Sequence, residues 1–534
     1  MPDAWKGLYI TPCQRFRTAW LLLAVLIVTA SACGPRGRPF SDHELAVLGA
    51  SEAVVRLFRQ NPDVVWPGYD LSRQPFIIYV PDNWALLLNA PAGKAVEGFS
   101  ALPAGWPDLG TPALYHEGQY QDLVGQLAFA VPVGDFEVAA IGIPEGLIPE
   151  QAFPNPGLMD FIIHENFHEF QDKNFGEIPW EREERYPILD AGNTALAYIE
   201  MALLKDALGA AYARDRVRIE EAARLFAAVR KERWEKGPPF VRSYEQGQEI
   251  REGTAQYVQM KCVDLLKDLD YRSAVSSRNV RDAIKGFSPL AIRLKDFETR
   301  MNGNTIEPDD MIRNRIYPVG ATLGFLADAL GVAWKGPAQK AGPDFAFHDV
   351  LSNGLSPAGR SAPALVEEVK HRYGYEEILR ATNESIAGYK EGFRQALETF
   401  ESQPGIRIEI SFSYRSLSRS RVGAGRKWVI DDGAVTLGRT FRVFTLKNDD
   451  LSVETRGNGV LENDDWSGKK KRAAFFVPEI TTLTIDGVAQ KLEPSLSRGF
   501  KTLELTGPNF AVSVRTPGVL AVSGRAVIVS LKRP

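Results

Sequence analysis

The chain of 534 residues is too long for one ordinary hydrophobic core, so we expect roughly two to four domains. Hydrophobic residues make up 44% and charged residues 24%, which is the balance of a soluble globular protein and excludes a disordered or multi-spanning chain. The formal net charge of -4 also argues against a nucleic-acid partner, because such proteins carry a strong basic excess.

Residues 1–32 have the features of a bacterial lipoprotein signal peptide. Lys6, Arg15 and Arg17 precede the apolar run AWLLLAVLIVTASA, which is too short to span a bilayer comfortably. Cys33 then follows three small residues that resemble a lipobox, with Ala where Leu is usual. We expect cleavage before Cys33 and a lipid anchor on this cysteine; the alternative is ordinary secretion with Cys33 incidental.

A lipid on Cys33 would place the protein in the cell envelope, at the outer membrane or the cell surface. Gly34 after the cysteine gives no inner-membrane retention signal of the Asp type. With Cys13 removed and Cys33 acylated, Cys262 would have no cysteine partner, so we expect no disulfide within the chain.

After a tether at residues 33–40, residues 41–150 predict a small α+β region. Ser41 opens an amphipathic helix that runs to about Arg59. Apolar runs at 75–90 and 126–144 predict two pairs of strands, with turns at Asp82-Asn83 and Gly134-Asp135.

Residues 151–402 predict a mostly helical domain, and residues 405–534 predict an all-β domain. Asn155 and Pro156 give a helix cap and a first-turn proline, and this helix should run to about Asp172. From 405 onward, short runs such as IRIEISFSY and FAVSVRT alternate with turn residues, which favours a β-sandwich. The predicted fold class is therefore α+β.

The segment FIIHENFHEF, residues 161–170, carries the chemistry. His164 and His168 are four residues apart, so on a helix both project from one face and can bind one zinc ion. Glu165 lies about 100° round the helix, where it can take a proton from zinc-activated water. The alternative, two histidines satisfied in a core, would leave Glu165 buried without a charge partner on a largely apolar helix.

A catalytic zinc also needs a third protein ligand and an open fourth position. The best carboxylate downstream is Glu252 in REGTAQYVQ, on a predicted helix of its own. Glu200 in PILDAGNTALAYIE is the rival ligand. Glu249, one turn before Glu252, is better suited to orienting a ligand histidine.

Together HENFH, EGTAQY and RIYPVGATLGFLADAL resemble the gluzincin metallopeptidases, most closely the peptidase-MA-like and glycyl aminopeptidase types. The resemblance covers about residues 155–335 and implies a zincin-like core. It also implies that His164, His168 and Glu252 bind one Zn²⁺ and that Glu165 is the general base. The departure is the 83 residues between His168 and Glu252, where many gluzincins have roughly twenty.

The resemblance also suggests roles for Tyr317 and Gly253. Tyr317 would donate a hydrogen bond to the developing oxyanion. An aromatic residue before a proline is also a common packing residue, and Tyr257, Arg315 or His348 would be substitutes. Gly253 would let the Glu252 helix approach the histidine helix closely.

The sequence thus predicts a membrane-anchored zinc metallohydrolase, most simply a peptidase acting on a peptide or protein. Two alternatives from other classes stay open. One is a surface lipoprotein with a non-catalytic zincin-like core that binds protein or glycan, and the other is a surface scaffold without metal. We expect the remaining histidines His43, His116 and His371 to lie at the surface.

Overall fold

The computed structural model describes residues 39–91, 93, 95–120, 128–133, 136–146, 155–176, 183–355, 361–414 and 416–531. The predicted signal peptide, Cys33 and the turn at Gly134-Asp135 lie outside the described residues. The chain divides into two compact units. The first comprises residues 1–180, 196–302 and 313–373, and the second comprises residues 181–195, 303–312 and 374–534. Among the described residues, no helix has the length and apolar character that crossing a bilayer requires.

The N-terminal part of the first unit is a mixed sheet with a helix packed on it. Its strands are β1 (Phe76–Val80), β2 (Trp84–Leu88), β3 (Ser100–Ala101), β4 (Ala113–Glu117), β5 (Ala128–Val133) and β6 (Phe136–Gly142), in the order β3-β4-β2-β1-β6-β5. The pair β1–β6 is parallel and the others are antiparallel. The two predicted strand pairs are present, and β3 and β4 are additional.

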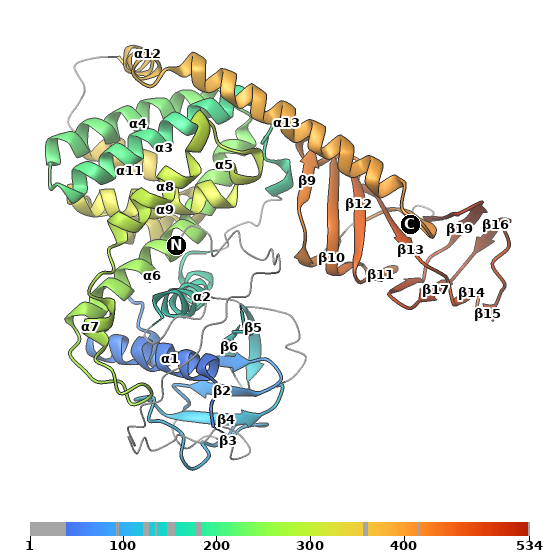
Figure 1. The fold of residues 1–534 in the computed structure, drawn as a ribbon, viewed down its shortest axis with the longest axis horizontal. Helices are drawn as coiled ribbons and strands as arrows, with labels where there is room; N and C mark the ends of the chain where they lie inside the picture. The colour runs from blue at the N-terminus through green and yellow to red at the C-terminus, as the bar shows by residue number, and fades with distance from the viewer. Residues whose placement is uncertain are drawn as a thin grey trace, which may run out of the picture. The chain divides into compact units, whose positions relative to one another are not determined.

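Helix α1 (Asp42–Gln60) covers this sheet, as Figure 1 shows. Ser41 and Glu44 form a reciprocal capping box, which explains why the helix begins where the sequence predicts. The buried Glu44 carboxylate also accepts a hydrogen bond of 2.8 Å from the Trp84 indole on β2. This contact fixes the cap of α1 to the centre of the sheet.

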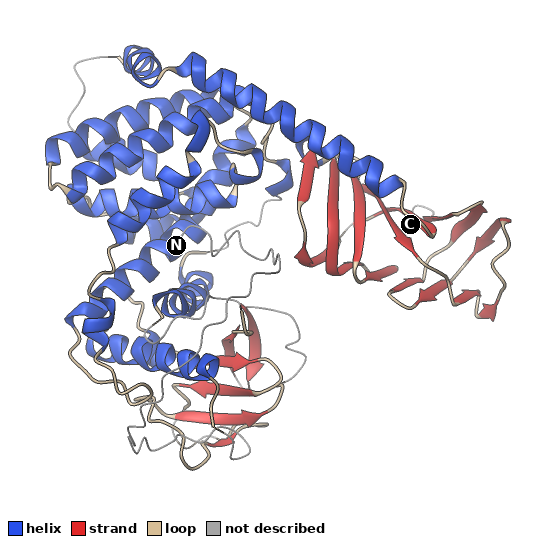
Figure 2. Cartoon of the chain, viewed as in Figure 1, coloured by secondary structure: helices blue, strands red, loops and turns tan. Residues whose placement is uncertain are grey.

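The rest of the first unit is helical (Figure 2). Its helices are α2 (Pro156–Asn174), α3 (Ala191–Tyr212), α4 (Arg216–Lys236), α5 (Pro239–Gln248), α6 (Thr254–Leu265), α7 (Val280–Ile284), α8 (Pro289–Arg300), α9 (Arg313–Leu330), α10 (Lys335–Ala341), α11 (Phe347–Gly354) and α12 (Ala362–Tyr373). A π-helical turn, η4 (Glu249–Gly253), joins α5 to α6. Helix α2 packs against α1, β6 and α6, and η4 packs against α9. The helix predicted from Asn155 to about Asp172 is α2.

The second unit consists of one curled antiparallel-rich sheet and a long helix. Helix α13 (Tyr375–Glu401) groups with the strands, although the sequence placed it in the helical domain. Its Phe400 packs on Leu437, Leu461 and Phe476, so it covers one face of the sheet (Figure 1). The strands are β7 (Ile406–Ser413), β8 (Ser418–Ala424), β9 (Lys427–Ile430), β10 (Val435–Lys447), β11 (Leu451–Thr455), β12 (Asn458–Asp465), β13 (Lys470–Val477), β14 (Thr482–Ile485), β15 (Val488–Ala489), β16 (Ser495–Phe500), β17 (Leu503–Gly507), β18 (Phe510–Val514), β19 (Gly518–Ser523) and β20 (Ala526–Leu531).

The predicted all-β character holds, but these strands form one continuous sheet rather than the two separate sheets of a sandwich. The reason lies in β10, which carries an irregularity between Gly438 and Phe441. Its first part pairs with β9 and β12, and its second part pairs with β8 and β11. A bulge of this kind bends a strand. The sheet therefore curls around a core that includes Phe444, Val453 and Phe475.

Candidate metal centre

Helix α2 brings the two histidines of the HENFH segment to one point. The side chain of Asn155 accepts hydrogen bonds from the backbone N–H groups of Gly157 and Leu158, which fixes the start of the helix. From there the helical period places His164 and His168 on one face, with their Nε2 atoms 3.0 Å apart. Both imidazoles therefore present Nε2 to the same site.

The third donor comes from the π-helical turn η4. Glu252 Oε2 lies 3.2 Å from Nε2 of His164 and 3.5 Å from Nε2 of His168. A π turn inserts one residue into a helix and is frequent at functional sites, because it changes the direction in which a side chain points. Here it directs a largely buried carboxylate at the two histidines.

These three side chains fit a tetrahedral zinc ion. Bonds of about 2.0–2.2 Å at tetrahedral angles require donor atoms roughly 3.3–3.5 Å apart. The three donor atoms are separated by 3.0, 3.2 and 3.5 Å. Two imidazoles and one carboxylate are also a ligand set that catalytic zinc sites use, with the fourth position left open. His164, His168 and Glu252 could thus hold a metal ion together.

The charges at the centre agree with this fit. Burial by itself raises the pKa of Glu252, but the charges and hydrogen bonds of His168 and His164 outweigh it and hold that pKa well below its usual range. Burial likewise opposes the charged form of His164, yet the hydrogen bond to Glu252 and the nearby charge of Glu165 raise its pKa to about 9. Metal binding at such a site would release protons, because imidazole and carboxylate groups bind a metal ion in their deprotonated forms.

Each histidine is oriented by a glutamine on its other ring nitrogen. Nδ1 of His164 lies 2.6 Å from Gln259 Oε1, and Nδ1 of His168 lies 2.7 Å from Gln171 Oε1. An amide oxygen only accepts, so each Nδ1 carries the proton and Nε2 is left for the metal. Gln259 also bonds to Asp160, whose pKa burial raises to about 7.

These glutamines were not predicted from the sequence, although a signal was present. Gln171 follows His168 by three residues, so helical periodicity places it on the same face as His168. Gln259 follows Glu252 by seven residues, so it lies on the face that carries Glu252. The orienting role predicted for Glu249 is wrong. Its carboxylate accepts a 2.7 Å hydrogen bond from Arg230 and does not bond to a histidine.

Glu165 lies beside the centre and is only partly buried. Across the described ranges it makes no hydrogen bond or ion pair, although its charge contributes to the raised pKa of His164. A carboxylate in this situation keeps its oxygens available for a substrate or water.

The rival ligand Glu200 belongs to a separate buried cluster of six charged residues. Arg230 and Arg233 both donate to its carboxylate, at 2.8 and 2.6 Å. The cluster is completed by Glu245, Glu249 and Arg315, so three acidic and three basic side chains balance one another. Glu200 is thus fully engaged by arginines, whereas Glu252 faces the histidines.

Tyr317 lies in the second turn of α9 and is partly buried. Each of the three substitutes predicted for Tyr317 has a hydrogen-bond partner. The Tyr257 hydroxyl donates to Asp328 at 2.5 Å, Arg315 donates to Glu245, and His348 Nε2 bonds to the carbonyl of Ala227 at 3.1 Å.

The close approach predicted at Gly253 exists, but its partner is Gly320 of α9 rather than the histidine helix. Tyr317 lies one helical turn before Gly320. The crossing therefore links the turn that carries Glu252 to the helix that carries Tyr317.

Among the other histidines, the surface prediction for His43 is wrong. His43 is 8% exposed, and its Nε2 bonds to the carbonyl of Ile143 at 2.9 Å. His371 is exposed, and His116 is partly buried with hydrogen bonds to the carbonyls of Gly98 and Gln119. In the described part of the chain, Cys262 is a free buried cysteine.

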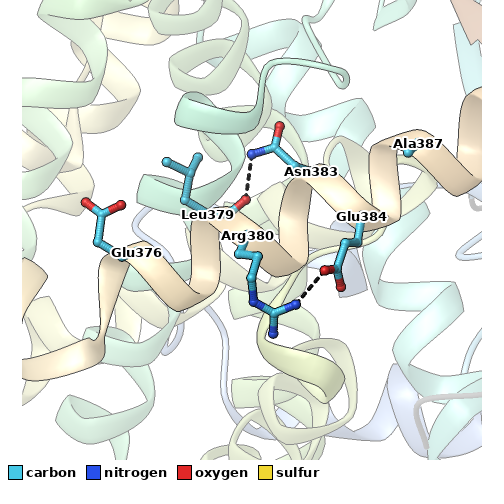
Figure 3. A pocket seen from close by; sticks show the side chains of 6 residues that line it. All are labelled: Glu376, Leu379, Arg380, Asn383, Glu384 and Ala387. Atoms are coloured by element: carbon cyan, nitrogen blue, oxygen red, sulfur yellow. Dashed lines mark hydrogen bonds and ion pairs between the residues drawn. The ribbon is translucent and has the colours of Figure 1, made fainter.

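Two hollows on the surface of the described residues contain none of the residues of this centre. One is lined by Glu376, Leu379, Arg380, Asn383, Glu384 and Ala387, all on α13 (Figure 3). Arg380 pairs with Glu384 there, and Asn383 bonds to the carbonyl of Leu379 in its own helix. A second hollow lies between α3, α4, α8 and α12.

No family model matches the sequence, and no curated protein or solved structure proved similar to the chain.

Proposed function

We propose that this chain is a zinc-dependent metallohydrolase, most simply a peptidase of the gluzincin type with a zincin-like catalytic core. The observation that carries the proposal is the convergence of His164 Nε2, His168 Nε2 and Glu252 Oε2 at tetrahedral spacing, with Glu165 next to His164 on α2. A structural ion would need a fourth protein ligand. Three protein donors instead match a catalytic site with one open position.

The proposed roles combine the positions of these residues with the resemblance to the gluzincins. A zinc ion supplies Lewis acidity, which lowers the pKa of water and polarises a carbonyl oxygen. Glu165 accepts the proton of the attacking water and returns it to the leaving amine. Tyr317 is the proposed hydrogen-bond donor to the oxyanion. The two glutamines keep both imidazoles in the tautomer that binds metal.

The proposal includes a location. We propose that the chain is held in the cell envelope through a lipid on Cys33, at the outer membrane or the cell surface. The support is the basic and apolar leader followed by Ala30-Ser31-Ala32 and Cys33. Its substrate would then be a peptide or protein on the outer side of the inner membrane.

The experiment that tests catalysis compares zinc-loaded wild type with Glu165→Gln on a peptide library. The amide has the shape of the carboxylate but cannot accept the proton, so hydrolysis should fall by about 10²- to 10⁴-fold while bound zinc is retained. Glu169→Gln is the matched control, because Glu169 lies one turn further along α2 and pairs with Lys173 at 2.6 Å.

Undiminished hydrolysis by Glu165→Gln would assign the activity to another site or to a contaminant. A zinc-loaded wild type that cuts no peptide, protein or ester would favour the alternative, a surface lipoprotein whose core binds protein or glycan without catalysis.

A further inference from the structure

Gln171 contacts both halves of the metal centre. It lies on α2, one turn after His168, and its side chain is fully buried. Its Oε1 is 2.7 Å from Nδ1 of His168. Its Nε2 lies 3.0 Å from the carbonyl of Ile250, 2.8 Å from the carbonyl of Arg251 and 2.8 Å from the hydroxyl of Thr254. Ile250 and Arg251 precede Glu252 within η4, and Thr254 is the first residue after η4.

The orientation of the amide follows from these partners. Backbone carbonyls only accept hydrogen bonds, so the side-chain atom that faces Ile250 and Arg251 has to be the donor nitrogen. The amide oxygen is then left for His168, which has to donate from Nδ1. One amide therefore fixes the tautomer of His168 and, at its other end, holds the backbone that carries Glu252.

The π turn explains why such a contact is needed. A π turn departs from the regular hydrogen-bond pattern of an α-helix. Its carbonyls then depend on other donors for full satisfaction. The carbonyl of Ile250 accepts from Gln171 and also from the Thr254 hydroxyl, at 3.0 and 2.5 Å. Buried side-chain donors thus stabilise the local geometry that points Glu252 at the histidines.

We propose that Gln171 is a positioning residue that sets His168 and Glu252 relative to each other, so that the two ligands meet at one metal ion. This inference rests on the proposed metal centre. It goes beyond orienting a single histidine, because the same side chain also determines where the carboxylate ligand lies.

Two substitutions distinguish the contact of Gln171 Oε1 with His168 from the contacts of Gln171 Nε2 with η4. Gln171→Met keeps the length and removes both contacts. Gln171→Glu keeps an acceptor for His168 but replaces the donor with an oxygen that faces the carbonyls of Ile250 and Arg251. Zinc affinity is measured by competition with a chelator, and coordination geometry is measured from the visible spectrum of the cobalt(II)-substituted protein.

We expect Gln171→Met to weaken zinc binding by about 10- to 100-fold and to alter the cobalt spectrum. We expect Gln171→Glu not to restore the affinity. The matched control is Asn174→Ala, because Asn174 is an exposed amide one turn further along α2 that bonds to the carbonyl of Phe170 in its own helix. Thr254→Val removes the Thr254 hydroxyl but leaves the contacts of Gln171 with His168, Ile250 and Arg251. It should therefore weaken zinc binding less than Gln171→Met.

Zinc affinity in Gln171→Met equal to that of wild type would overturn the proposal. Full recovery in Gln171→Glu would overturn the link to Glu252 and leave a role on His168 alone. If wild type binds no zinc, the proposed function is what fails. In that case, hydrogen exchange of the backbone amides of residues 249–258 in the metal-free protein tests whether Gln171 stabilises η4. Faster exchange in Gln171→Met than in wild type supports the proposed stabilisation of η4 by Gln171. Unchanged exchange overturns that role.

Discussion

Gly253 of η4 and Gly320 of α9 meet backbone to backbone. A Cβ added to Gly253 would lie 2.6 Å from the Cα of Gly320, and one added to Gly320 would lie 2.8 Å from the Cα of Gly253. Real Cβ atoms do not approach backbone atoms this closely, so a side chain at either position would force the two helices apart. Glu252 is the neighbour of Gly253, and the metal centre therefore depends on this crossing.

Gly320→Ala should displace η4 and with it the carboxylate of Glu252. We expect a loss of about 1–3 kcal/mol in the free energy of unfolding, which is typical of overpacking, and roughly 10-fold weaker zinc binding. Chemical denaturation and chelator competition measure the two effects. The matched control is Gly209→Ala in α3, where an added Cβ meets nothing within 4 Å. Equal effects of the two substitutions would mean that the crossing does not position Glu252.

Glu200→Ala should destabilise the fold without removing the metal. The substitution leaves Arg230 and Arg233 buried with one carboxylate fewer to pair with. Breaking a buried ion pair by removing one partner costs about 3–5 kcal/mol. Thermal unfolding should therefore shift to lower temperature while zinc per folded molecule stays at the wild-type level. Selective loss of zinc from folded Glu200→Ala would make this residue a ligand after all.

The second unit should lose stability in acid. Glu184 and Glu462 accept hydrogen bonds from Arg421, and Glu462 also pairs with the buried Lys471. Burial opposes their ionisation, but the basic neighbours outweigh it and lower the pKa of each carboxyl from 4.5 to about 2. An unfolded chain binds protons near 4.5 that the folded unit binds only near 2, so the stabilisation is present above 4.5 and is lost as the pH falls.

Equilibrium unfolding of the full chain between pH 6 and pH 2, followed by hydrogen exchange in residues 416–477, measures this acid sensitivity. We expect the unfolding free energy of this unit to fall by roughly a few kcal/mol across that range. Glu462→Gln should lower the stability at pH 6 and flatten the pH dependence. An unchanged slope in Glu462→Gln would mean that other carboxylates carry the effect.

Cys33→Ser should move the protein from the membrane fraction to the soluble fraction, because a lipid can no longer be attached there. Detergent partitioning of cell extracts checks this expectation. Cys262→Ser is the matched control, since Cys262 is buried in the folded chain and cannot carry an anchor. Unchanged partitioning of Cys33→Ser would mean that an uncleaved leader or another element holds the chain at the membrane.

Local signals account for what the sequence predicted. Caps at Ser41 and Asn155 defined the starts of α1 and α2, and the four-residue spacing of the histidines placed them on one face. Apolar runs likewise predicted the strand pairs β1–β2 and β5–β6 and about half of the strands of the second sheet.

The missed features depend on contacts between distant segments. The π turn η4 is stabilised by Gln171 from α2 and by the fit of Gly253 against Gly320. The burial of Glu200 with Arg230 and Arg233 combines charges from different helices, so composition does not reveal it. The curling of the second sheet follows from the way β10 shares its length among four neighbours, which no single strand pattern encodes.

Metal analysis of the purified chain tests the central claim most directly. After exposure to zinc and removal of excess metal, wild type should hold about one ion per chain, as expected for a three-ligand catalytic centre. His168→Ala and Glu252→Ala should each lose most of it while remaining folded, because each removes one of the three donor atoms. A wild-type chain without bound zinc, or full occupancy in Glu252→Ala, would contradict the account.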